Sequence, residues 1–177
     1  MDAPAALFLI RPYRESDADA VGRLIADTFA RFNLAFASAD QLALLLGPFR
    51  HAGSPDPAQR AAIAEMIRSP IVLVAEDEDE VVGILRGRSE RLASLFVRGD
   101  HHRRGIGRRL VTAFEEDRPL SGDAVIRLAS TLYAVPFYPA LGYRRTTGVR
   151  VGRSFDGTGL PYQPMRKRLY DVPVRGR

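Results

Sequence analysis

The stretch from Leu95 to Leu110 limits the fold of this chain most strongly, because it joins an apolar strand to a helix through a short polar turn. The strand is expected to cover Arg91 to Val97, and the helix is expected to begin at Gly105. The core face of that helix is expected to hold Ile106, Leu110, Ala113 and Phe114. This arrangement indicates a domain in which helices pack on a sheet.

The turn before this helix has the chemistry of an anion site. The first N–H groups of a helix have no internal partner, and the helix dipole adds positive charge there. Gly105 and Gly107 leave these donors open to a phosphate. The densest arginine cluster of the chain surrounds them: Arg98, Arg103, Arg104, Arg108 and Arg109. Together these features predict a cradle for a pyrophosphate.

Two better-known phosphate motifs do not fit this turn. A Walker A loop is excluded, because no Gly-Lys-Ser/Thr follows the glycines. The dinucleotide fingerprint fits poorly, because a third glycine is missing and the strand lies in the middle of the chain. A Gly-x-Gly pair alone also occurs in plain turns, so the pair needs support from elsewhere in the sequence.

The remaining pattern predicts an α/β (α+β) fold with one mixed, mostly antiparallel sheet of about six to seven strands flanked by helices. Further strands are expected at 7–11, 71–75, 81–85, 125–129, 144–151 and 163–169. Further helices are expected after a Ser16 cap, at 40–46, after Asp56-Pro57 and, in short form, at 131–141. We expect a single domain over residues 1–177, because no linker or repeat is visible.

Composition excludes several classes of site. With 177 residues and 46% hydrophobic content, the chain can form a core of its own. It contains no cysteine, which excludes disulfides, thiolate metal sites and a cysteine nucleophile, and no metal site is expected. The N-terminus has no signal-peptide pattern and no membrane-spanning run, so we expect a cytoplasmic protein. Almost all of the basic residues behind the net charge of +5 are arginines. We attribute most of this arginine excess to general composition rather than to function.

Two motifs carry a family resemblance. His102-Arg103-Arg104-Gly105-Ile106-Gly107 resembles the acetyl-CoA-binding motif of the GNAT superfamily of N-acetyltransferases, Gln/Arg-x-x-Gly-x-Gly/Ala, with His102 as the departure. Downstream, the segment 137–143, Phe-Tyr-Pro-Ala-Leu-Gly-Tyr, resembles the family's Phe-Tyr-x-x-Leu-Gly-Phe/Tyr signature. Both motifs occur in the family's order, and the resemblance covers nearly the whole chain.

The resemblance implies acetyl-CoA as cofactor and a primary amine of a small molecule as acceptor. It implies that two neighbouring parallel strands separate, so that the edge formed by Leu95, Phe96 and Val97 pairs with the pantetheine arm. Backbone N–H groups near Phe96 or Val97 would hold the thioester carbonyl. The pyrophosphate would lie on His102, Arg103, Arg104, Gly105, Ile106, Gly107 and Arg108.

Tyr138 matches the position from which the family often supplies a general acid, and its phenol is protonated at neutral pH. No general base is assigned. Its candidates are Glu76, Glu90, Asp100, His101 and His102, of which the two histidines are expected to be solvated loop residues. Many family members use ordered water instead.

For the acceptor site, Phe36 and Tyr162 are the aromatic candidates. We expect monoamines or amino-acid-like acceptors rather than polyamines, peptides or nucleic acids. Two other functions stay open: a GNAT-fold protein that binds CoA without acetylating, and a basic nucleic-acid-binding module, which the spread of the arginines disfavours. The sequence leaves the oligomeric state open, a homodimer included, and no membrane association is expected.

Overall fold

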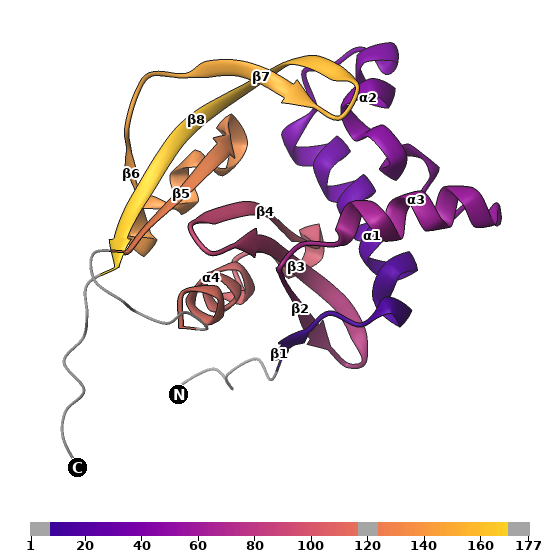
Figure 1. Ribbon diagram of the computed structural model, residues 1–177, viewed down its shortest axis with the longest axis horizontal. Coiled ribbons are helices and arrows are strands. Elements are labelled where there is room, and N and C mark those ends of the chain that lie inside the picture. Colours follow the sequence, from indigo (N-terminus) through magenta and orange to yellow (C-terminus); the bar gives the residue numbers. More distant parts are fainter. Residues whose placement is uncertain (1–7, 117–123, 170–177) are drawn as a thin grey trace.

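The computed structural model describes residues 8–116 and 124–169 (Figure 1). Its centre is a mixed sheet in the order β1-β2-β3-β4-β5-β8-β6, with β7 paired to β8. The strands are β1 Leu9–Pro12, β2 Ile71–Asp77, β3 Glu80–Arg88, β4 Arg91–Val97, β5 Ala124–Thr131, β6 Arg144–Arg145, β7 Arg150–Ser154 and β8 Gly157–Leu169. All neighbouring strands are antiparallel except β4 and β5. The expected fold class is therefore confirmed.

Helices cover both faces of the sheet. They are α1 Ala18–Thr28, α2 Ala39–Leu46, α3 Pro57–Ile67 and α4 Ile106–Glu116. Successive side chains of a strand point to opposite faces, and β3 shows this directly. Ile84 packs with the core residues of α1 and α3, whereas Leu85 packs with Leu110 and Phe114 of α4. The sheet thus separates α4 from α1 and α3 (Figure 1).

The sheet divides between its two parallel strands. β4 and β5 share a single residue pair, Arg91 with Arg127, and beyond it neither strand is paired with the other. Figure 1 shows β1 to β4 and β5 to β8 as two half-sheets that separate at this point. One edge of β4 is therefore left without a neighbouring strand from Leu92 to Val97.

The start of α1 differs from the expectation of a Ser16 cap. A short 3-10 helix, Glu15–Asp17, precedes α1, and the carboxylate of Asp17 accepts from the N–H of Arg14 at 2.7 Å. The same carboxylate pairs with the Arg11 guanidinium at 2.8 Å, and both side chains are about nine-tenths buried. The Asp17 carboxylate, held by Arg11 of β1, therefore makes the polar contacts at the start of this segment, and Ser16 does not cap the helix.

Elsewhere the elements agree with the sequence in kind and differ at their ends. Ser38 caps α2 with a return contact from Gln41, and Asp56 caps α3 as expected. The stretch expected as one strand at 144–151 contains two, β6 and β7, so the described chain has eight strands. Leu7, the first residue of the strand expected at 7–11, lies outside the described residues. Within the described ranges, no helix has the length and apolar character needed to cross a bilayer.

Candidate functional site

The free edge of β4 presents the backbone groups of Leu95 and Val97. The N–H of Arg98 donates to the carbonyl of Val82 on β3 at 2.8 Å. Groups that face one neighbour alternate along an antiparallel strand, so Phe96 also directs its N–H and C=O toward β3. Leu95 and Val97 direct theirs the opposite way, toward the gap between the half-sheets. Of the two N–H positions expected from sequence, Val97 faces the gap and Phe96 does not.

The turn between β4 and α4 ends in a run of open backbone donors. The chain turns back through positive φ at Arg103 (61°) and Gly105 (85°), and the carbonyl of Gly105 accepts the first helical bond, from Arg109. Among the described residues, no backbone carbonyl outside the helix accepts a hydrogen bond of normal geometry from the N–H groups of residues 103–108. These donors lie at the positive end of α4, which is the position that an anion favours.

His101 and Arg104 join this turn to the β2–β3 hairpin. Arg104 pairs with Asp77 at 2.9 Å, and the two ring nitrogens of His101 contact Asp77 at 3.2 Å and Asp100 at 2.7 Å. Hydrogen bonds from His101 and then Arg98 lower the pKa of Asp100 to about 2. The expectation that His101 is a solvated loop residue is wrong, because the ring is buried between these two carboxylates.

His102 is half-buried and is tied to the free edge of β4. Its Nε2 lies 2.8 Å from the carbonyl oxygen of Val97, so this nitrogen carries the proton and donates. The ring also contacts Phe32, with centroids 4.8 Å apart, and Phe32 stacks on Tyr133 at 5.4 Å. The departure from the family motif thus fixes the end of β4 against the turn, and the expectation of a solvated His102 is wrong as well.

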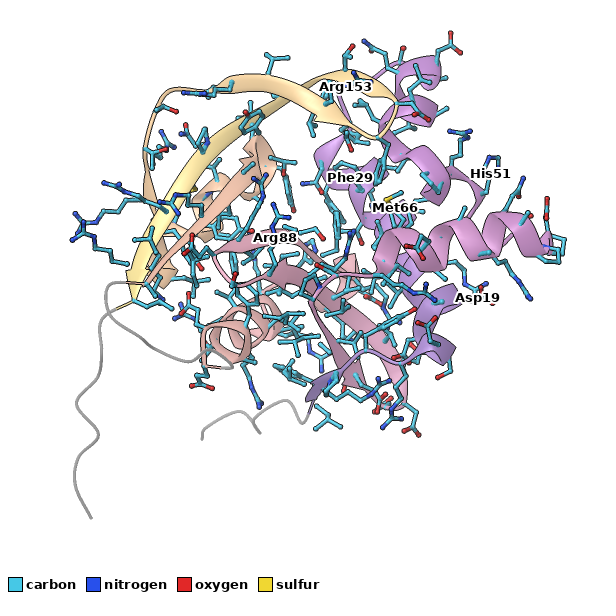
Figure 2. The ribbon with its side chains drawn as sticks, viewed as in Figure 1. Asp19, Phe29, His51, Met66, Arg88 and Arg153 are labelled. Carbon is cyan, nitrogen blue, oxygen red and sulfur yellow. The ribbon has the colours of Figure 1, made fainter. Side chains whose placement is uncertain are left out.

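Two cavities occupy the gap between the half-sheets. The first, which we call the loop cavity, has a volume of about 600 Å³ and is lined by Val97, residues 101–103 and 105–108, and Phe137. The second, which we call the arginine cavity, has a volume of about 350 Å³ and is lined by Arg86, Arg91 and Arg153 among others. Figure 2 labels two residues that line the arginine cavity from different parts of the chain, Phe29 at the end of α1 and Arg153 on β7.

The two cavities share one wall. Five residues line both of them: Asn33, Leu95, Phe96, Ala134 and Tyr138. A molecule in one cavity therefore meets a molecule in the other at these side chains. The side chains of Asn33 and Thr131 form a hydrogen bond that spans the gap beside this wall.

Tyr138 occupies this shared wall. The 3-10 helices Leu132–Phe137 and Pro139–Leu141 hold it, and the segment ends at Gly142 with φ 88°, a left-handed position that glycine adopts at little cost. The ring packs edge-on against Phe137 and Tyr143, and the residue is 5% exposed. Burial raises the pKa of the Tyr138 phenol well above its ordinary value, so the hydroxyl keeps its proton at neutral pH.

The turn fits a large anionic cofactor. A Cβ built on Gly105 meets no atom within 4 Å, so the space beside this residue is open. A Cβ on Gly107 would lie 3.2 Å from the Phe137 ring, so this glycine lets α4 approach the 3-10 helix closely. The Thr28 hydroxyl lines the loop cavity, is buried, and has no partner among the described residues. Open amides, a free strand edge and an unpaired hydroxyl are the groups that a phosphate and an extended amide chain require.

The structure does not bring the aromatic candidates for the acceptor to this site. Phe36 is 54% exposed in the turn before α2 and lines neither cavity, because the chain turns outward after the buried Leu34. Tyr162 on β8 lines a separate hollow beside β6 and β7. In their place stand Phe32 and Tyr133 beside the loop cavity, and Phe29 in the arginine cavity.

Of the candidate bases, only the two histidines line the gap in the described chain, and both rings already have hydrogen-bond partners there. Glu76 pairs with Arg11, Asp100 with Arg98 and His101, and Glu90 lies 3.4 Å from Arg127 in an exposed turn. No aspartate or glutamate lines either cavity within residues 8–116 and 124–169. In the same part of the chain, no group of three or more metal-ligating side chains is gathered.

Comparison with known proteins places this geometry in a family. The model of the acetyltransferase (GNAT) domain matches residues 54–169. A GCN5-related N-acetyltransferase structure from Rhodopseudomonas palustris is 20% identical with a TM-score of 0.74, covering 96% of this chain and all of that one. The PaiA N-acetyltransferase of Thermoplasma acidophilum in complex with coenzyme A is 16% identical, with a TM-score of 0.66 over 92% of this chain and 99% of that one.

An aminoglycoside 6'-N-acetyltransferase complexed with coenzyme A is 17% identical, with a TM-score of 0.59 over 93% of this chain and 99% of that one. A sequence search of curated proteins gave no match. At these identities the solved structures support the fold alone. The domain model, which spans well over half of the sequence and includes both motifs, shows that the chain belongs to the GNAT acetyltransferase family.

Proposed function

We propose that this protein is an acetyl-CoA-dependent N-acetyltransferase that acts on a primary amine of a small molecule. The observation that supports this most strongly is the wall shared by the two cavities. One side offers open amides and a free strand edge, which suit the cofactor, and the other offers a smaller cavity for an acceptor. Tyr138 lies between them.

The cofactor is expected to lie in the loop cavity. Its pyrophosphate would accept from the N–H groups of residues 103–108, with charge from Arg103 and Arg108. Arg104 is already paired with Asp77, so we assign it to shaping the turn. The backbone groups of Leu95 and Val97 would hold the pantetheine amides and the acetyl carbonyl. When bound, acetyl-CoA supplies an activated acetyl group and a thiol leaving group.

The residues at the shared wall would then direct acetyl transfer. The neutral amine nitrogen forms a bond to the acetyl carbon while the bond from that carbon to sulfur breaks. One proton leaves the nitrogen and one reaches the sulfur. We assign the second to the Tyr138 hydroxyl, which keeps its proton because burial raises its pKa. We assign the first to water, since no carboxylate of the described chain lines either cavity and the two histidine rings that line the loop cavity already have hydrogen-bond partners.

The first prediction tests the turn. Gly105→Ala places a methyl group in the open space where the phosphates would lie, so it should weaken CoA binding at least about tenfold. Gly159→Ala is the matched control, because Gly159 has the same φ of 85°, equally open surroundings, and lines neither cavity. Isothermal titration with CoA measures both affinities.

The control separates strain from obstruction. Both substitutions force an alanine into a left-handed conformation, so both should lower thermal stability by a similar amount. Only Gly105→Ala should lower the affinity for CoA. If wild-type protein shows no binding heat and no thermal stabilisation in millimolar acetyl-CoA, the proposed function is wrong.

A further inference from the structure

The arginine cavity contains a half-buried cation that has no counter-ion among the described residues. Arg86 lies on β3 and its side chain points to the α1 face of the sheet, where it lines the cavity beside Ile25 and Phe49. Its Nε is buried and has no hydrogen-bond partner among the described residues. No carboxylate of residues 8–116 or 124–169 pairs with it, and burial alone lowers its pKa.

A second unpaired polar group lies beside it. Ser94 on β4 is the cross-strand partner of Arg86, so the two side chains share one face of the sheet. The Ser94 hydroxyl lines the same cavity, is buried, and also has no partner among the described residues. Buried polar atoms are nearly always paired in folded proteins, so two neighbouring exceptions that face one cavity indicate a missing ligand.

The charge of the walls specifies the kind of ligand. Arg86, Arg91 and Arg153 all line the cavity, and no described acidic residue does. The remaining wall is mostly apolar, with Phe29, Phe49 and Phe155 among its side chains. An unpaired guanidinium in such surroundings favours an anion with two oxygens in a plane, which a carboxylate provides.

We propose that the Arg86 guanidinium and the Ser94 hydroxyl hold the carboxylate of the acceptor, so that the acceptor is an amine of the amino-acid type. The inference rests on the proposed N-acetyltransferase function and adds the chemical class of its acceptor. The cavity places the two ends of such a molecule. Its carboxylate lies at the Arg86–Ser94 pair, and its amine reaches the shared wall at Leu95 and Tyr138.

The test uses acceptors that differ only in the carboxylate. Two matched sets serve: leucine, leucinamide and isoamylamine, and phenylalanine, phenylalaninamide and phenethylamine. CoA release measures kcat/KM for each. Wild type should prefer the amino acid in at least one set by about 10- to 100-fold, the range expected of hydrogen bonds to a charged group.

Variants then locate the carboxylate site. Arg86→Met should abolish the preference for the amino acid over its amide, and Ser94→Ala should reduce it. Arg88→Met is the control, because Arg88 lies on the same strand, is exposed, and lines neither cavity. It should keep the wild-type preference. If Arg86→Met does not fold, Arg86→Gln replaces it, with an unchanged CoA affinity as the sign of an intact fold.

A binding measurement separates this inference from the proposed function. Titration of the amino acid into protein saturated with CoA requires no turnover, so binding that Arg86→Met removes would support the carboxylate site even if no amine were acetylated. Turnover of amines without any preference for the carboxylate would overturn the inference and leave the proposed function standing. Preference for an aminoalkyl phosphate, such as phosphoethanolamine, over both amino acids would also overturn the carboxylate assignment.

Discussion

At the scale of single residues, the unpaired Arg86 has a cost to the ligand-free protein. A buried charge without a partner destabilises the fold, since its lost hydration is not replaced. We therefore expect Arg86→Met, which keeps much of the packing volume, to raise the melting temperature of the ligand-free protein. For a chain of this length, each ~1 kcal/mol gained would add about 2–4 °C.

Thermal unfolding followed by circular dichroism measures this effect. A gain in stability together with a loss of acceptor preference is typical of a residue kept for binding. A lower melting temperature would instead indicate that the aliphatic stem of Arg86 stabilises the fold through its packing in the cavity wall.

Tyr138 supports a second prediction at this scale. Tyr138→Phe removes the hydroxyl and keeps the ring contacts with Phe137 and Tyr143, so it should lower kcat about 100-fold and leave the affinity for CoA unchanged. The control is Tyr143→Phe, which also loses a buried phenol oxygen, one that donates to Glu115 at 2.9 Å outside the gap. It should affect stability and spare turnover. Wild-type kcat in Tyr138→Phe would exclude the proposed acid role.

At the scale of elements, the buried pair of Arg11 and Asp17 joins β1 to the start of α1, and Glu76 adds β2 to the same network. The hydrogen bond from Arg11 is the largest cause that lowers the pKa of Asp17 in the folded protein. A carboxylate whose pKa is lower in the folded state stabilises the fold above its unfolded pKa, near 4, and loses that contribution as the pH falls through its folded pKa.

The prediction follows from this sign. Asp17→Asn should lower the free energy of unfolding by about 3 kcal/mol at neutral pH, since it leaves Arg11 short of a buried partner. The difference from wild type should shrink below about pH 4, where Asp17 takes up a proton in the unfolded chain before it does so in the folded protein. Urea unfolding across this pH range measures it. A difference that stays constant with pH would show that the ion pair does not carry the effect.

The elements also show what the sequence could predict. The turn at 98–105, the start of α4 and the segment that holds Tyr138 were predictable, because each depends on local chemistry: glycines, helix ends and a short motif. The sequence predicted β8 too short, because prolines are unfavourable inside most strands. Pro161 lies beyond the last residue paired with β5, and Pro164 sends its carbonyl to Thr146 on the other side, so neither ring costs a bond to β5.

The acceptor side of the site was not predictable in this way. Arg86 and Ser94 meet through the register of two strands, and nothing in the local sequence marks that pairing. Phe32 follows Phe29 at helical spacing, a pattern that by itself predicts the core face of the first helix. The helix continues as a wider π-helical turn over Phe29–Asn33, which rotates Phe32 toward His102. The position of Phe36 was not predictable either. It lies in a turn, and no periodic pattern in the sequence shows to which side a turn directs its side chains.

At the scale of the whole molecule, the gap makes ligand binding a contact between two half-sheets. Beyond Arg91 and Arg127, β4 and β5 have no paired residues, so a ligand between them would supply the missing contacts. We expect acetyl-CoA at ~100 times its dissociation constant to add about 2.7 kcal/mol to the free energy of unfolding. Hydrogen exchange should then slow in β4 and also in β5 and β8.

Mass spectrometry of exchanged peptides would test this. Protection confined to the turn at 98–105 would mean that the ligand binds the first half-sheet alone, and that the gap has another role. Helix α3 serves as the internal control, because none of its residues lines either cavity.

The position of the free edge of β4 also bears on aggregation, because it limits pairing with strands of other molecules. An unpaired strand edge can pair with a strand of another molecule, and proteins usually prevent this with charged residues, prolines or bulges at the edge. Here the open edge at Leu95 and Val97 faces inward, between two half-sheets, where α4 and the segment around Tyr138 leave room for a slender ligand. The same enclosure that selects an extended cofactor thus keeps the edge from seeding aggregates.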